Sequence, residues 1–159
     1  MPLFKRLVLT HSIEIKTTPE KIWEFFTHLE KNYTTWHPKD HVKFIWTSGK
    51  PLELGSAIYS EQYVFGKIQK YKGYIKEIVP NRKIVFGFRY PVSLITPKIE
   101  WLMEPKRSNT IFTAITYMRA GHLYKKLFKK GMKNLIEAHD KHVSEEGENL
   151  KKTLENNSK

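Results

Sequence analysis

Two side chains of the kind that bind metal ions lie one helical turn apart near the C-terminus, His142 and Glu146. The residues around them repeat apolar side chains with helical spacing. At about 100° per residue, His142 and Glu146 lie only about 40° apart within that apolar stripe. A buried carboxylate is costly unless it is paired or binds a cation. The spacing therefore favours a metal site, and the alternative is that the two side chains simply pair inside a polar pocket.

A second group of such residues is the string WHPKDH at positions 36–41. Its proline turn places two imidazoles, His37 and His41, in one short segment. Asp40 adds a carboxylate that can orient a histidine by accepting its second N–H. Either histidine could be a ligand, and the alternative is an ordinary polar turn.

Glu61 supplies the second candidate carboxylate, in a segment with the period of a β-strand. On a period of two it shares a face with Ala57, Tyr59, Tyr63 and Phe65. If this aromatic face lines a cavity, Glu61 lies inside. If the face points outward, Glu61 is a solvated carboxylate.

Two imidazoles and two carboxylates form a ligand set that suits zinc, or manganese or iron at higher coordination number. The chain has no cysteine, so a metal must be held by nitrogen and oxygen. The remaining candidates fall into two groups. Proton donors or orienting groups are His37, Tyr59, Tyr63 and His139, and residues lining the ligand are Trp36, Phe65, Tyr74 and Leu135.

The fold that must position these residues can be predicted from the periodicity of apolar side chains along the chain. A strand over residues 7–16 leads into the helix start at 17–20, TTPE, with a hydroxyl cap and a proline in the first turn. The predicted elements are helices to about residue 29 and over 30–36, strands over 42–47, 56–65, 67–79, 83–89, 99–103 and 110–118, and a helix from about 121 to 154. We expect an α+β helix-grip: a seven-stranded antiparallel sheet curved around the long C-terminal helix, in one domain spanning 1–159 with a polar tail from about 155.

The formal net charge of +12 in 159 residues raises the question of nucleic acid. The lysines of the C-terminal segment lie off its apolar stripe, as on a solvated helix face, and no phosphate-binding motif accompanies them. Nucleic acid is therefore not the expected partner. With no apolar run of membrane-spanning length and no signal-peptide pattern, we expect a soluble cytoplasmic protein.

The strand-into-helix opening at residues 13–26, IEIKTTPEKIWEFF, resembles that of the START-like superfamily, also called SRPBCC, birch-pollen-allergen-like or polyketide cyclase/dehydrase. The order of elements matches over nearly the whole chain. The resemblance implies a small hydrophobic ligand held between the sheet and the long helix. Some members of this superfamily are enzymes and many only bind or carry a ligand.

The pattern of WHPxDH, a strand Glu and a final His-x-x-x-Glu is similar to the diacetylphloroglucinol hydrolase branch of that superfamily. This similarity implies zinc held by His41 (or His37), Glu61, His142 and Glu146, and hydrolysis of a carbon–carbon bond between an acyl group and a phenolic ring. Three hypotheses follow: a metal-dependent hydrolase or lyase acting on a small aromatic or polyketide-like ketone, a metal-free carrier of a hydrophobic molecule, and a partner-binding domain that uses the basic helix face.

Overall fold

The computed structural model describes residues 4–121 and 129–157, and within them seven antiparallel strands form one sheet. The order across the sheet is β1-β7-β6-β5-β4-β3-β2, so only the β1–β7 pairing joins strands distant in sequence. The strands are β1 (Phe4–Ile15), β2 (His41–Ser48), β3 (Ala57–Val64), β4 (Lys67–Val79), β5 (Lys83–Phe88), β6 (Lys98–Lys106) and β7 (Asn109–Gly121). The helices are α1 (Pro19–Thr27), α2 (Leu29–Trp36), the 3-10 helix η1 (Val92–Leu94) and α4 (Lys129–Asn156).

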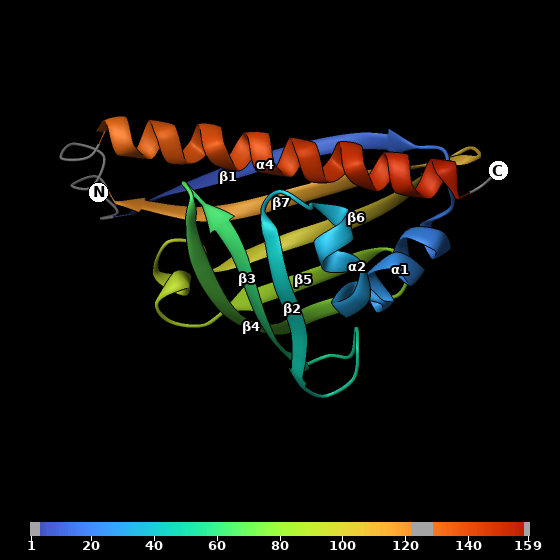
Figure 1. Ribbon diagram of the computed structural model, residues 1–159, viewed down its shortest axis with the longest axis horizontal. Coiled ribbons are helices and arrows are strands. Elements are labelled where there is room, and N and C mark those ends of the chain that lie inside the picture. The colour runs from blue at the N-terminus through green and yellow to red at the C-terminus, as the bar shows by residue number, and fades with distance from the viewer. Residues whose placement is uncertain (1–3, 122–128, 158–159) are drawn as a thin grey trace.

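The predicted helix-grip is confirmed by this arrangement. Figure 1 shows α4 running along the length of the sheet beside β1, with α1 and α2 placed near its C-terminal end. Gly121, the predicted first residue of the long helix, belongs to β7, and the stretch 122–128 lies outside the described residues. No helix in the described part of the chain is both long and apolar enough to cross a membrane.

The two short helices form where the sequence places a cap and an apolar face. Thr18 caps α1 with its hydroxyl, which accepts the Lys21 N–H at 3.4 Å, and Pro19 occupies the first turn. His28 separates α1 from α2 with a backbone conformation outside the helical range. The resulting bend directs the end of α2, at Trp36, toward α4.

An aromatic core fixes this end of the molecule. Phe26 stacks on Trp101 with ring centroids 4.5 Å apart, and Trp36 packs edge-on against Phe26 at 5.5 Å. On the side of α4, Leu150 is fully buried. The α4 residues of the core cluster are Val143, Leu150 and Leu154, all in the C-terminal half of the helix, whereas Leu135 is only half-buried.

A glycine in α4 allows the helix to lie close to the sheet. A Cβ atom at Gly147 would come within 3.3 Å of His11 Cε1 and 3.4 Å of Ile13 Cγ2, both on β1. Glycine destabilises a helix interior relative to alanine. The close approach to β1 is therefore the structural reason for a glycine at position 147.

Candidate metal centre and ligand cavity

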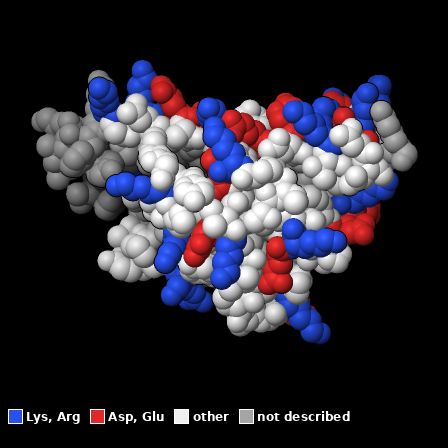
Figure 2. All heavy atoms as spheres, in the orientation of Figure 1, with Lys and Arg blue, Asp and Glu red and all other residues white. Residues whose placement is uncertain are grey.

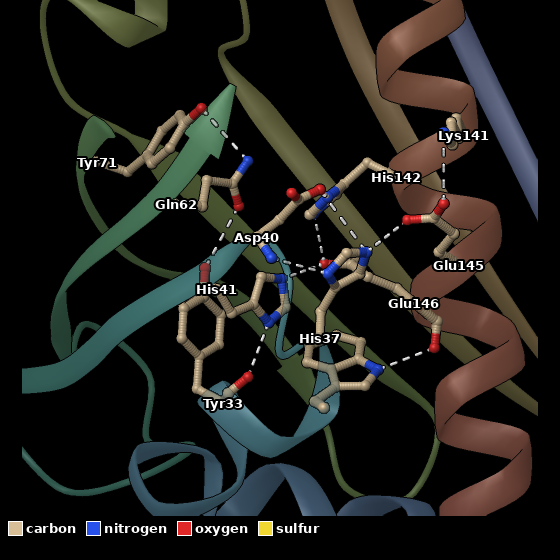
Figure 3. A network of polar contacts seen from close by, with 11 residues as sticks. Tyr33, His37, Asp40, His41, Gln62, Tyr71, Lys141, His142, Glu145 and Glu146 are labelled. Atoms are coloured by element: carbon tan, nitrogen blue, oxygen red, sulfur yellow. Dashed lines mark hydrogen bonds and ion pairs between the residues drawn. The ribbon is translucent and has the colours of Figure 1, made fainter. Parts of the chain in front are cut away.

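A tight turn between α2 and β2 holds both candidate histidines of the WHPKDH string inside the protein. The N–H groups of Asp40 and His41 both donate to the carbonyl of His37, at 3.2 and 2.9 Å. The His37 and His41 residues are 2% and 4% exposed. The turn thus presents two buried imidazoles to α4 (Figure 3).

The carboxylate of Glu146 is the point on which two histidines converge. Its Oε1 lies 2.8 Å from Nε2 of His41 and 3.0 Å from Nε2 of His142. The side chain of Glu146 is 13% exposed, and that of His41 is fully buried. One carboxylate oxygen therefore faces two ring nitrogens from different segments of the chain.

The second nitrogen of each ring is already occupied by an acceptor. Nδ1 of His41 lies 2.9 Å from the backbone carbonyl oxygen of Tyr33, and Nδ1 of His142 lies 3.0 Å from Oδ2 of Asp40. A carbonyl and an ionised carboxylate only accept, so both Nδ1 atoms carry hydrogen. In their neutral forms both histidines consequently turn an Nε2 lone pair toward Glu146, the orientation found in metal-ligating histidines.

Charge within this cluster is mutually dependent. Burial acts to lower the pKa of His142, but the facing Glu146 and Asp40 carboxylates outweigh it and raise that pKa to about 9. Burial acts to raise the pKa of Glu146, yet His142 and His41 hold it far below its ordinary value. Glu146 is therefore ionised in the fold, and either a proton or a metal cation must balance it.

His37 stands behind this arrangement. Its Nδ1 accepts the Asp40 N–H at 3.2 Å, which leaves Nε2–H to donate to Glu145 at 2.9 Å. Its ring stacks on that of His142 with centroids 4.6 Å apart. Two groups of donor atoms lie close enough for one ion: His41, His142 and Glu146, and His37, Asp40 and His142. The orientation of the lone pairs favours the first group.

Glu61 does not lie with these residues, and the prediction that it faces the cavity is wrong. Ser60 and Gln62, its neighbours in β3, line the cavity, so Glu61 points to the other face of the sheet. There its carboxylate accepts the hydroxyl of Tyr59 at 2.5 Å. The period of two was correct, but Ser60 and Gln62 face the cavity, whereas Tyr59 and Glu61 lie on the other face of the sheet.

A cavity adjoins the candidate metal centre. Its inner part, about 150 Å³, lies between the sheet and α4 and includes His142 and Glu146 in its wall. An outer part of about 630 Å³ continues from it. The residues common to both parts are Gln62, Tyr71, Val92, Thr96, His139 and His142.

The other predicted residues divide between the cavity and the outer face of the sheet. Trp36 lines the inner part and donates its indole N–H to the Glu146 carbonyl at 2.9 Å. Tyr63, Phe65 and Leu135 line the outer part. Two predictions are wrong in position, because Tyr59 shares the outer face with Glu61, and Tyr74 packs against Gly87 and under the Arg89 guanidinium, outside both parts.

His139 lies in both parts of the cavity. Its Nε2 is 2.8 Å from the hydroxyl oxygen of Thr116, and burial lowers its pKa. It is therefore a neutral imidazole beside the cavity at neutral pH.

Reasoning from the sequence missed a polar group on the opposite wall. Tyr33 donates its hydroxyl to Gln62 Oε1 at 3.3 Å, and Gln62 donates its amide to the Tyr71 hydroxyl at 3.4 Å. The sequence does contain a signal for this group, because the polar residues Ser60 and Gln62 alternate with Tyr59 and Tyr63 and so share one face of β3. Figure 3 shows this group facing the histidine cluster.

No protein-family model matches the sequence, and no curated protein matches it. Solved structures do match its fold. TTHA0849 from Thermus thermophilus superposes with a TM-score of 0.73 over 96% of this chain and 100% of that one, at 12% identity. The Zhui aromatase/cyclase from Streptomyces sp. R1128 superposes with a TM-score of 0.76 over 98% of this chain and 97% of that one, at 11% identity.

Norcoclaurine synthase from Thalictrum flavum, in complex with dopamine and hydroxybenzaldehyde, gives a TM-score of 0.63 over 90% of this chain and 89% of that one, at 15% identity. At such low identities the similarities concern the fold. They confirm the helix-grip fold that the sequence predicted.

Proposed function

We propose that this chain is a metal-dependent hydrolase or lyase that acts on a small aromatic or polyketide-like ketone. His41, His142 and Glu146 hold zinc or another first-row divalent metal. The observation that carries the proposal is the convergence of two Nε2 atoms, at 2.8 and 3.0 Å, on one oxygen of Glu146 in the cavity wall.

The donor set fits such a metal. Two imidazoles and a carboxylate are the three-ligand set of several catalytic zinc sites, which leave a further position for substrate. Once bound, a divalent metal polarises a carbonyl group and lowers the pKa of water. Asp40 keeps His142 in the ligating tautomer, as Tyr33 does for His41.

The cavity supplies the remaining parts of the reaction. Trp36, Phe86 and Trp101 give it flat apolar walls that suit an aromatic ring. The amide of Gln62 and the hydroxyl of Tyr71 can hold a ring oxygen on the opposite side. His139 is neutral and pairs with Thr116, so it can accept the proton that the attacking water releases and pass it to the ring carbon that leaves. The ligands of the norcoclaurine synthase, dopamine and hydroxybenzaldehyde, support an aromatic ligand for this fold.

A metal-free carrier is the second candidate, and one observation favours it. The four groups Asp40, His41, His142 and Glu146 satisfy one another through hydrogen bonds when both His41 and His142 carry a hydrogen on Nε2. The cluster can therefore be stable without an ion.

Elemental analysis of the purified protein separates the two candidates. The enzyme proposal expects close to one equivalent of a first-row metal after dialysis, and release of the acyl group from an acylated polyhydroxybenzene that stops on chelation. A protein free of metal even after incubation with zinc, yet stabilised against heat by phenolic compounds, would establish the carrier instead.

A further inference from the structure

Exposed apolar side chains gather around the opening of the cavity. Tyr63, Phe65 and Ile68 lie on the β3–β4 hairpin and are 41%, 62% and 44% exposed. Leu94 and Ile95 lie at η1 and are 58% and 44% exposed. Among the described residues, these five and the adjacent Tyr90 make up most of the large apolar side chains that face solvent. The remainder are scattered: Val8, Leu54 and Val79.

The two segments border the same opening. Phe65 and Ile95 both line the outer part of the cavity, from the hairpin and from η1. Figure 1 shows the tip of the hairpin and the η1 segment toward the same end of the molecule, opposite the end where α1 and α2 lie. We call these five residues, 63, 65, 68, 94 and 95, the apolar rim.

Phe65 occupies an unfavourable place for an aromatic residue. It forms the hairpin turn with Gly66, and both have positive φ, 52° and 72°. Asn-Gly and Asp-Gly are the favoured pairs in such turns, because side chains other than Asn, Asp and Gly are strained there. Since Phe65 is also largely exposed, packing within the protein does not offset the strain. An exposed, strained aromatic at the rim of a cavity points to contact with something outside the chain.

Basic side chains accompany the apolar rim. From residue 62 to residue 76 the sequence contains four lysines and no acidic residue. Lys67, Lys70 and Lys72 are exposed on β4, and Lys39, in the turn before β2, lines the outer part of the cavity. Figure 2 shows Lys and Arg side chains around a pale surface on the left half of the visible face.

We propose that the apolar rim docks on an anionic lipid bilayer, so that the cavity exchanges a hydrophobic ligand directly with the membrane. The rim inserts at the level of the headgroups while Lys67 and Lys70 contact anionic lipid. A cavity that opens onto lipid lets an apolar ligand enter without crossing water. Docking of this kind does not depend on whether a metal is bound.

Sedimentation with vesicles tests the proposal. The wild-type protein should pellet with vesicles of phosphatidylcholine and phosphatidylglycerol but not with phosphatidylcholine alone. The double variant Phe65→Ser/Leu94→Ser should lower the bound fraction at least about fivefold, through loss of inserted apolar area. Lys67→Glu/Lys70→Glu should abolish the preference for anionic vesicles.

Matched controls lie in the loop at the other end of β3. Leu54 is 69% exposed and Lys50 is exposed there, so Leu54→Ser and Lys50→Glu should bind vesicles as the wild type does. Metal content and melting temperature of every variant establish that the fold and the metal centre persist. Absence of wild-type binding, or equal loss in the controls, would overturn the proposal. So would a soluble dimer that Phe65→Ser dissociates, which would assign the rim to a second copy of the chain.

Discussion

Glu146 is the residue that gives the site its chemical character. It is ionised and nearly buried, and each imidazole that faces it has its other nitrogen committed to a fixed acceptor. The negatively charged Oε1 of Glu146 and the Nε2 lone pairs of neutral His41 and His142 point toward one another, so a cation is needed between them. Protons and divalent metals therefore compete for the same place, and substitutions can tell them apart.

Removing one ligand should lower the metal content sharply. We expect His142→Ala and Glu146→Gln each to bind metal at least about tenfold more weakly, since each removes a donor atom from the centre. The matched control is Glu61→Gln, which removes a carboxylate that faces away from the cavity. Equilibrium dialysis with zinc measures the difference. Equal loss in Glu61→Gln would contradict the ligand set drawn from the structure.

Stability of the metal-free protein should fall as the solution becomes alkaline. The pKa of His142 is raised from 6.5 to about 9 in the fold, so its contribution is fully present below about pH 6.5 and is lost as the pH rises through about 9. Urea unfolding in the presence of a chelator, at about pH 6 and about pH 9, measures the loss, and His142→Asn should show a smaller one. With zinc present the stabilisation by metal should instead grow with pH, because protons no longer compete.

At the scale of residues, sequence spacing predicts which side chains of one helix lie together, but it does not predict which face of a strand points into the cavity. The separation of about 40° on a helix was enough to place His142 and Glu146 together. The alternation in β3 has two equivalent solutions, and the aromatic side chains favoured the wrong one for Glu61 and Tyr59. Asp40 was visible in the WHPKDH turn as a carboxylate able to orient a histidine, and the structure places it against His142.

At the scale of elements, α4 positions the centre through its close contact with β1. Gly147 allows this approach, since a Cβ there would meet His11 and Ile13 at 3.3 and 3.4 Å. Gly131, in the same helix, has nothing within 4 Å of such a Cβ. The close contact with β1 requires a glycine at position 147, whereas no contact requires one at position 131. The two glycines should therefore respond differently to substitution.

Gly147→Val should destabilise the fold by about 1–3 kcal/mol, because the larger side chain overpacks the contact with β1. It should also weaken zinc binding by displacing Glu146. Gly131→Ala should be neutral or stabilising by up to about 1 kcal/mol, because alanine favours the helix. Urea unfolding of both variants checks this pair. A Gly147→Val protein as stable as the wild type would show that α4 is not held at this contact.

The strands and helices were predictable because the sequence marks their ends. The β4 range of 67–79 agrees with the prediction, since Gly66 and Pro80 bound a long alternating segment. The start of the long helix was not predictable, because the residues leading to Gly121 continue the alternation of β7. Helix periodicity and strand alternation overlap there, and the pairing with β1 extends the strand.

At the scale of the whole molecule, the candidate centre joins two distant parts of the chain. The contact between His41 and Glu146 spans 105 residues, and that between His142 and Asp40 spans 102. The donors come together only when α2 and β2 on one side and α4 on the other are in place. An unfolded chain offers no comparable site, so binding free energy adds to the free energy of unfolding.

Zinc should therefore raise the melting temperature of the wild-type protein. At a free concentration about 1,000 times the dissociation constant the gain is about 4 kcal/mol. For a chain of this size that corresponds to a shift on the order of 8–16 °C. Differential scanning fluorimetry with buffered zinc measures it, and the chelated wild type sets the baseline. His142→Ala should show little shift, whereas His11→Ala should respond as the wild type does, because its histidine lies outside both donor groups. If His142→Ala shifted as far as the wild type, zinc would be binding elsewhere on the surface, and the cluster around Glu146 would be a proton-balanced network of a ligand carrier.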